Sequence, residues 1–388
     1  MKNAVASEIL RQIVAIPSVN PALADDPALR GEARLVEFLE PWFAKKGFRA
    51  ERVGATPGRP NLLARFGAAA PERTILFESH LDTVGVAGFA GDPFAPREEN
   101  GRLYGRGACD TKGPLAAFMA ALDAEVLAAL GKSATQLVWL GAIGEETGNL
   151  GAEEAVAAGL RADECVVLEP TDLRIVHAHK GACWFTVATR GRAVHASDPA
   201  CGDNAILKMP AVWRILEEAT AEAGKEFSSA ALGRPTVSVG VIRGGAATNV
   251  VPDACEIQVD RRLMPGETAA RVLADLRARL ASISGGVEIA LMKEGLPFHT
   301  DAEAGLVRRF GAALEGAGVA PAREGAAWCS DAGVLASACA ETLVWGPGAI
   351  AQAHTVDEYI EKDSLEAGRE TLRQFLLAAA RASSPLDS

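Results

Sequence analysis

The chain passes from an apolar, strand-like run into polar residues in the stretch TILFESHLDT (74–83), which contains His80 and Asp82. Two similar junctions follow, in which apolar runs end in carboxylates: LVWLGAIGEE (137–146) and VVLE (166–169). Short apolar runs that alternate with helical patterns indicate strands buried on both faces of a mostly parallel sheet. Because such sheets bind ligands at the carboxyl ends of their strands, we expect these polar residues to lie together.

The middle of the chain follows a different order of elements. Its patterns follow the ferredoxin-like plan β-α-β-β-α-β, a small sheet with two helices on one face. The strand-like runs are at 183–189, 235–242, 254–263 and 287–292, and the helical patterns are at 204–223 and 267–281. We therefore predict an α/β fold with a mostly parallel twisted sheet flanked by helices in residues 1–180 and 294–388, and an inserted lid or dimerisation domain in residues 181–293.

Two helical patterns outside the middle carry specific expectations. An apolar stripe at 35–43 predicts a helix that kinks or starts afresh at Pro41. The pattern at 114–130 predicts one long helix.

Composition and charge exclude several classes of function. The 388 residues are 49% hydrophobic and 23% charged, which is typical of a soluble globular protein. The net charge of −11 argues against a nucleic-acid partner, because phosphate binding needs a basic patch. No apolar run reaches membrane-spanning length and the N-terminus has no signal-peptide core, so we expect a cytoplasmic protein without a membrane partner. The seven cysteines are scattered without a C-x-x-C pair, which argues against a disulfide scaffold or a zinc knuckle.

Histidines and carboxylates near the predicted strand ends form a candidate site. Two members lie outside the runs already quoted: Asp110 in the glycine-rich segment GRGACDTKG (105–113), and His354 after the apolar run 343–345. Histidine together with carboxylate suits zinc or a similar divalent ion, and one carboxylate can bridge two ions. The candidate residues are His80, Asp82, Asp110, Glu145, Glu146, Glu169 and His354.

The spacing within two of these motifs predicts how the side chains divide their roles. His80 and Asp82 are one residue apart on an extended strand end, so they project to the same side, and Asp82 can hold one ring nitrogen while the other binds metal. Glu145 and Glu146 project to opposite sides of a strand end, so one can ligate metal while the other faces the substrate as a general base. Each motif alone also has a structural interpretation: a satisfied polar pair, a solvated acidic turn or, for Asp110, a helix N-cap.

In their order these motifs resemble the metallopeptidase family that contains acetylornithine deacetylases, succinyl-diaminopimelate desuccinylases, aminoacylases and glutamate carboxypeptidases. The resemblance covers nearly the whole chain, and through the segments 92–94, 101–105 and 343–359 it is greatest to the acetylornithine deacetylases. It implies a catalytic di-zinc domain, with cobalt as a substitute metal, and a non-proline cis peptide bond after the bridging aspartate. In the implied ligand set, one ion is held by His80 and Glu169, the other by Glu146 and His354, with Asp110 as the bridge and Glu145 as the general base.

The resemblance extends to the inserted domain. The segment GRAVHAS (191–197) resembles a motif whose histidine reaches the active site of a neighbouring subunit in dimeric members. By that likeness the protein would be a homodimer in which His195 stabilises the oxyanion. Asn249 would lie near the substrate, and Arg262 would clamp its α-carboxylate, because a guanidinium matches a carboxylate with two hydrogen bonds.

The activity that this resemblance implies is hydrolysis of the amide bond of a small-molecule N-acyl-L-amino acid. N²-acetyl-L-ornithine is the first choice of substrate, which would place the protein in arginine biosynthesis. A dipeptidase, a carboxypeptidase or another N-acyl-amino-acid amidohydrolase would keep the same site. A non-catalytic protein that binds an amino-acid derivative is more remote, because a binder needs no general base. The segments CSDAG (329–333) and HTVDE (354–358) depart from the deacetylase pattern, which weakens the substrate assignment and not the metal ligands.

Overall fold

The computed structural model describes residues 4–381 of the chain. Contacts divide the chain into two compact units, and each unit has its own sheet and its own hydrophobic core. Within the described residues, unit 1 comprises 4–177, 300–324 and 330–381, and unit 2 comprises 178–299 and 325–329.

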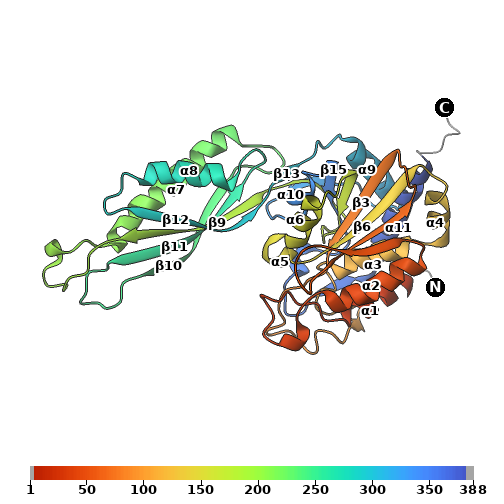
Figure 1. Ribbon diagram of the computed structural model, residues 1–388, viewed down its shortest axis with the longest axis horizontal. Helices are drawn as coiled ribbons and strands as arrows, with labels where there is room; N and C mark the ends of the chain where they lie inside the picture. The colour runs from red at the N-terminus through yellow and green to blue at the C-terminus, as the bar shows by residue number, and fades with distance from the viewer. Residues whose placement is uncertain (1–3, 382–388) are drawn as a thin grey trace. The chain divides into compact units, whose positions relative to one another are not determined.

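The large sheet has nine strands and is parallel at its centre (Figure 1). In order across the sheet the strands are β1 (Arg49–Val53), β2 (Asn61–Gly67), β6 (Thr135–Ala142), β3 (Arg73–His80), β7 (Ala162–Val167), β15 (Cys339–Val344), β8 (Ile175–His179) and β13 (Phe298–His299), with β14 (Arg323–Ala326) paired to β8. β6, β3, β7 and β15 are parallel neighbours, whereas the pairs toward both edges are antiparallel. The predicted α/β fold with a mostly parallel central sheet flanked by helices is confirmed.

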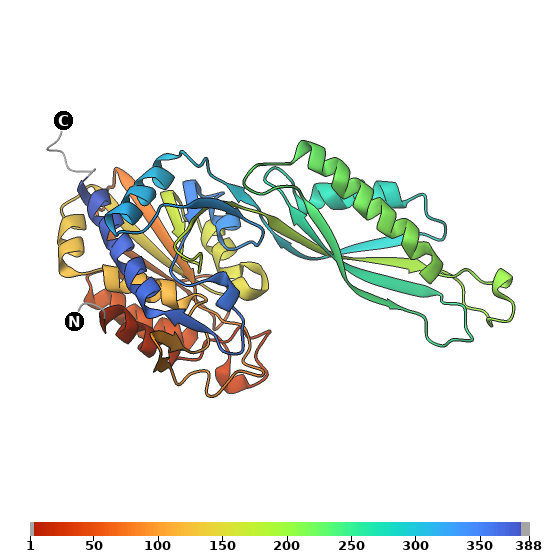
Figure 2. The ribbon, with the colours of Figure 1, turned by 180° about the vertical axis from the view of Figure 1, so that it is seen from behind.

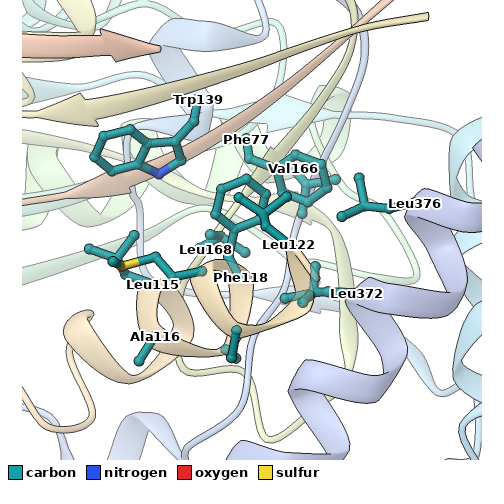
Figure 3. Packing of buried hydrophobic residues seen from close by; sticks show 14 of the residues in the cluster. Phe77, Leu115, Ala116, Phe118, Leu122, Trp139, Val166, Leu168, Leu372 and Leu376 are labelled. Carbon is teal, nitrogen blue, oxygen red and sulfur yellow. The ribbon is translucent and has the colours of Figure 1, made fainter. Parts of the chain in front are cut away.

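One set of helices encloses the main core of unit 1 together with this sheet. These helices are α1 (Ala4–Val14), α2 (Ala33–Lys45), α3 (Lys112–Ala121), α4 (Ala124–Leu130), α9 (Gly305–Gly316) and α11 (Lys362–Arg381). α3 is buried on all sides, and its Phe118 stacks on Phe77 of β3 with 4.8 Å between the ring centroids (Figure 3). α11 packs alongside α3 and α9 (Figure 2). The packing of α3 fixes the position of the loop that precedes it, which contains Asp110.

Two of these helices differ from the expectation from the apolar pattern. The stretch 114–130 is not one helix, because α3 and α4 meet at an angle of 73°. Asp123 caps the start of α4 by accepting a hydrogen bond from the backbone N–H of Val126 at 2.9 Å. α2 continues through Pro41 without a fresh start. Pro41 lies on the exposed face of the helix, where water can donate a hydrogen bond to the backbone carbonyl that has no N–H partner because of the proline.

Shorter elements complete unit 1. They are the three-stranded sheet of β4 (Arg97–Glu99), β5 (Arg102–Tyr104) and β16 (Tyr359–Glu361), the helices α5 (Glu145–Gly148), α6 (Leu150–Ala157) and α10 (Ala332–Leu335), and the 3-10 turns η1 (Pro27–Leu29) and η4 (Ile350–Gln352). Between residues 4 and 381 no single helix is long and apolar enough to cross a membrane, although the bent pair of α3 and α4 meets that test by length and composition alone.

Unit 2 contains a four-stranded antiparallel sheet with two helices on one face (Figure 1). Its main elements are β9 (Gly181–Arg190), α7 (Met209–Glu226), β10 (Thr236–Gly244), β11 (Ala254–Leu263), α8 (Ala269–Leu280) and β12 (Val287–Gly295), with the 3-10 turns η2 (Pro199–Cys201) and η3 (Ile206–Lys208). The sheet order is β10-β11-β9-β12, and the chain order is the β-α-β-β-α-β order that the sequence predicts. Burial alternates along β11, so that every second side chain enters the core under the helices.

Candidate metal centre

The structure places all seven candidate residues in unit 1: Asp82, which follows the end of β3, and six others at the carboxyl ends of the parallel strands or in loops. β3 ends at His80, β7 ends just before Glu169, and α5 begins with Glu145 and Glu146 shortly after the end of β6. The other two, Asp110 and His354, lie in the loop before α3 and in the loop between η4 and β16. Sheet edge and loops thus supply the site together.

Asp110 lies between the two histidines. Its Oδ1 is 2.9 Å from Nε2 of His80, and its Oδ2 is 3.2 Å from Nε2 of His354. Nε2 of His80 is also 3.8 Å from Oε1 of Glu169, and Nε2 of His354 is 3.1 Å from Oε2 of Glu146. Two groups result, each with one histidine, one glutamate and a separate oxygen of Asp110.

These two groups have the chemistry and the spacing of divalent-metal ligands. Within each group the candidate ligand atoms all lie within 4.8 Å of one another. Ligand atoms about 2.0–2.2 Å from a zinc ion in tetrahedral geometry are about 3.4 Å apart, which is close to the distances found here. Oε1 of Glu146 is buried and has no hydrogen-bond partner among residues 4–381, so a cation beside it would satisfy an acceptor that the protein leaves open. The donor set therefore fits a pair of divalent cations that share Asp110.

Burial, hydrogen bonds and neighbouring charges shift the pKa values of the members of the site. Burial raises the pKa of Glu169 well above its ordinary value, against the opposing charge of His80. Hydrogen bonds to Asp110 and Glu146 raise the pKa of His354 to about 10 in the metal-free protein. In the metal-free protein, protons on the histidines balance the negative charge of the carboxylates. Metal ions would balance the same charge, so metal binding must release these protons.

Glu145 and Glu146 lie on a helix and not on an extended strand end. β6 stops at Ala142, Gly144 turns the chain with a φ of 72°, and α5 begins at Glu145. The expected alternation of the two side chains across a strand end is therefore wrong. The two glutamates still differ, because Glu146 faces His354 whereas Glu145 is in neither ligand group. Burial raises the pKa of Glu145 well above its ordinary value, opposed by His80 and reinforced by Glu169.

The carboxylate of Asp82 has a contact that the sequence did not reveal. Nδ1 of His80 is 2.9 Å from the backbone carbonyl oxygen of Asp82 and 3.6 Å from its Oδ1, so the backbone provides the shorter contact. The carboxylate accepts hydrogen bonds from the backbone N–H of Glu145 at 3.1 Å and of Glu146 at 3.2 Å, and from Nδ2 of Asn20 at 2.7 Å. Asp82 thus holds the first turn of α5 beside the end of β3.

Asp110 does not cap the helix that follows it. α3 begins at Lys112, and its N-cap is Thr111, which makes no side-chain capping bond. The Thr111 hydroxyl instead donates to the carbonyl oxygen of Leu168, at the end of β7. The peptide bond between Asp110 and Thr111 is cis, as the resemblance implied.

Sequence reasoning missed several buried polar residues around the site. Asp331 is fully buried and accepts a hydrogen bond from Nδ2 of Asn149 at 2.8 Å. Glu78 is buried in β3, two residues before His80, and its pKa is raised well above normal by burial and by Asp331. A charged residue directly after the apolar run 75–77 of β3 was the one available signal for Glu78. The remaining two, Asn20 and Asp331, carry no local signal.

The other predicted residues lie in unit 2. His195 is exposed, with Nδ1 2.8 Å from the hydroxyl oxygen of Ser197. Its loop meets that of Asn249, whose backbone carbonyl accepts a hydrogen bond from Ala196 at 2.9 Å. Arg262 lies on β11 and forms an ion pair with Asp260 at 2.9 Å, so its guanidinium already has an anionic partner.

The histidine pair of β8 makes contacts that suit a structural role. Nδ1 of His177 is 2.8 Å from the carbonyl oxygen of Thr300. His179 meets the ring of Phe298 edge-on at 4.5 Å, and burial lowers its pKa to about 4. Neither histidine belongs to either ligand group of the described residues.

Comparison with known proteins agrees with this geometry. Residues 76–378 match the family model described as peptidase family M20/M25/M40. The chain is 33% identical over 381 residues to a protein of Edwardsiella ictaluri (strain 93-146) named acetylornithine deacetylase, covering 95% of this chain and 96% of that protein. Two solved structures share the fold. A metallo-carboxypeptidase of the M20 family from Sulfolobus solfataricus has a TM-score of 0.78 and 18% identity, and the aminopeptidase PepT from Bacillus cereus ATCC 10987 has a TM-score of 0.75 and 21% identity; each match covers 97% of this chain and 99% of that one. The chain thus belongs to peptidase family M20/M25/M40 and is a metal-dependent hydrolase.

Proposed function

We propose that this protein hydrolyses the amide bond of an N-acyl-L-amino acid with two divalent metal ions, zinc in the first place and cobalt as a substitute. The observation that carries the proposal is the position of Asp110, which offers one oxygen to each of two histidine–carboxylate groups. N²-acetyl-L-ornithine is the substrate we favour, because the relative in Edwardsiella ictaluri is named acetylornithine deacetylase.

The residues of unit 1 divide the work as follows. His80 and Glu169 hold one cation, Glu146 and His354 hold the other, and Asp110 is shared. When bound, such a pair of cations lowers the pKa of water and polarises an acyl carbonyl. Glu145 takes the proton of the attacking water and delivers it to the leaving amine. Asp82 orients Glu145 through the backbone of α5.

The residues of unit 2 act on the substrate in this proposal. His195 donates a hydrogen bond to the oxyanion, Asn249 contacts the substrate, and Arg262 clamps its α-carboxylate after exchanging its ion pair with Asp260. We further propose that the protein is a cytoplasmic homodimer that pairs through its inserted domain, residues 181–293. The edge strand β10 supports this, because within the described residues its outer edge has no pairing strand and its Ile242 is 61% exposed.

A second candidate, a dipeptidase or carboxypeptidase, is favoured by the solved structures that share the fold, since those named above are an aminopeptidase and a carboxypeptidase. Both reactions cleave an amide bond, so the same unit 1 residues serve either one. Selection between them lies in the groups that bind the acyl part and the free carboxylate of the substrate.

A steady-state panel tests the proposal. Metal-free protein, and protein restored with zinc or cobalt, is assayed on N²-acetyl-L-ornithine, other N-acyl-L-amino acids and dipeptides. We expect metal-dependent turnover with acetylornithine fastest. Faster metal-dependent turnover of a dipeptide would establish the second candidate. Absence of turnover on the whole panel, with two metals bound, would contradict both.

A further inference from the structure

One buried carboxylate outside the ligand set accepts several hydrogen bonds from the loop that contains Asp110. Glu358 is 1% exposed, and no sequence argument gave it a role. Its Oε2 accepts hydrogen bonds from Nη1 of Arg106 at 2.7 Å and from the backbone N–H of Gly107 at 3.0 Å. Its Oε1 accepts from the backbone N–H groups of Cys109 at 2.8 Å and of Asp110 at 3.0 Å. Four donors from residues 106–110 therefore converge on one side chain.

The loop around this carboxylate is also held by backbone hydrogen bonds, from the N–H of Arg106 to the carbonyl oxygen of Pro93 at 2.9 Å and from the N–H of Ala108 to that of Gly105 at 3.0 Å. Residues 105–110 belong to no helix or strand, and Gly107 has a φ of 81°. A Cβ at Gly107 would lie 2.9 Å from Cγ2 of Thr83, so the backbone approaches its neighbours too closely for a side chain. Successive backbone N–H groups that point at one anion form a concave nest. Glu358 supplies that anion from within the protein.

Glu358 also connects the two ligands that come from loops. It follows His354 by four residues and precedes β16, which pairs with β5 directly before the Asp110 loop. The backbone carbonyl oxygen of Glu358 accepts a further hydrogen bond from Gly105 at 3.1 Å. The segment with His354 and the loop with Asp110 are therefore joined at Glu358.

We infer that Glu358 is a positioning residue for the metal site, which holds Asp110 and His354 in the correct positions relative to each other. This inference rests on the proposed two-metal function. Asp110 belongs to both ligand groups and His354 to one, so loss of Glu358 weakens binding at both groups and weakens it most at the group of Asp110, Glu146 and His354. Partners that orient ligands in this way affect metal affinity by about 10–100-fold.

The substitution Glu358→Gln tests this with almost no change of shape. An amide has one acceptor oxygen, so its NH₂ group must face either the Arg106 and Gly107 donors or the Cys109 and Asp110 donors. Glu361→Gln is the matched control, because Glu361 lies three residues further along, at the end of β16, but is exposed and pairs with Arg102 at 2.7 Å. Glu358→Asp is the second variant, since it keeps the charge but shortens the reach to the four donors.

Metal-free parent and variants are titrated with Co²⁺, followed by the absorption of the bound ion and by calorimetry, and thermal unfolding of the metal-free proteins is recorded. We expect two ions in the parent and in Glu361→Gln, and at least tenfold weaker binding of one ion in both Glu358 variants. If folded Glu358→Gln binds both Co²⁺ ions as tightly as the parent, the inference is overturned, even if its unfolding temperature is lower. If Glu358→Gln does not fold, the same result with Glu358→Asp overturns it. Failure of the parent to bind two ions would instead contradict the proposed function.

Discussion

Asp82→Asn is the substitution whose effect follows most directly from the geometry. The carboxylate accepts three hydrogen bonds: Oδ1 from the N–H of Glu145, and Oδ2 from the N–H of Glu146 and from Asn20. Burial alone would raise the pKa of Asp82, but the neighbouring imidazole of His80 and these hydrogen bonds hold it below its ordinary value. The group is therefore ionised at neutral pH, and its charge reinforces the bonds to α5.

The size of the effect can be worked from these bonds. An asparagine has one acceptor oxygen, so in either orientation its NH₂ group opposes at least one N–H donor. Loss of one buried, charge-assisted hydrogen bond costs about 1.5–3 kcal/mol. If that free energy holds Glu145 in its reactive position, it corresponds to about 10- to 150-fold in kcat/KM, because each 1.36 kcal/mol is tenfold.

The assay measures kcat/KM with the best substrate of the panel at saturating zinc, together with bound metal and thermal unfolding. We expect the loss to fall mainly on kcat, with two metals still bound. Asp163→Asn is the matched control, because Asp163 is exposed and its carboxylate also accepts from a backbone N–H, that of Thr74 at 2.7 Å. A value of kcat/KM for Asp82→Asn within threefold of the parent, with metal content unchanged, would refute the positioning argument.

Four further outcomes follow from the same structure. Glu145→Gln should keep both metals and lose about 10²–10⁴-fold in kcat, because it cannot accept the proton of water; near-parent kcat with the purified variant would remove Glu145 from the base role. In the metal-free protein the pKa of His354 is raised from 6.5 to about 10. Protonation of this imidazole therefore stabilises the folded state fully below pH 6.5, and this contribution is lost as the pH rises toward 10. Unfolding temperatures across that range should therefore fall more for the parent than for His354→Ala, and parallel curves would contradict this. Phe118→Ala should lower the free energy of unfolding by about 3–5 kcal/mol, since the ring is fully buried and stacked on Phe77; denaturant titration measures this, and a loss under 1 kcal/mol would show that the core does not depend on this contact. Mixing inactive His195→Ala with inactive Glu145→Gln should restore part of the activity if His195 acts across a dimer, because one site of the mixed dimer then has both intact residues; absence of any recovery in proven mixed dimers would place His195 on its own subunit's site or outside catalysis.

The elements that the sequence predicted well are those encoded by neighbouring residues. The apolar runs before His80 and Glu169 form buried parallel strands, so the strand ends and their polar residues are predictable from the sequence. The prediction for 114–130 failed because apolar periodicity does not register a break of two residues, although Asp123 is a typical cap. The helical start of Glu145 had a comparable signal, since acidic residues are frequent in a first helical turn.

Other features depend on residues far apart in the chain. From the sequence, Asp110 is equally consistent with a helix cap and with a bridging ligand. The structure distinguishes the two, because Nε2 of His80 lies beside its Oδ1 and Nε2 of His354 beside its Oδ2. Glu358 is an ordinary acidic residue in the sequence, and its four donors lie about 250 residues earlier.

Short-range patterns of apolar and polar residues encode the alternation of the main strands and helices, the motifs of the family and the chemical type of the metal ligands, so the amino-acid sequence is enough to predict these features. Which ligand faces which, how Asp82 holds α5 and how Glu358 binds the loop of Asp110 are evident only in the folded protein. Those relations are distances between segments that the folding of the sheet and the packing of α3 and α11 bring together. No local pattern specifies a distance of that kind.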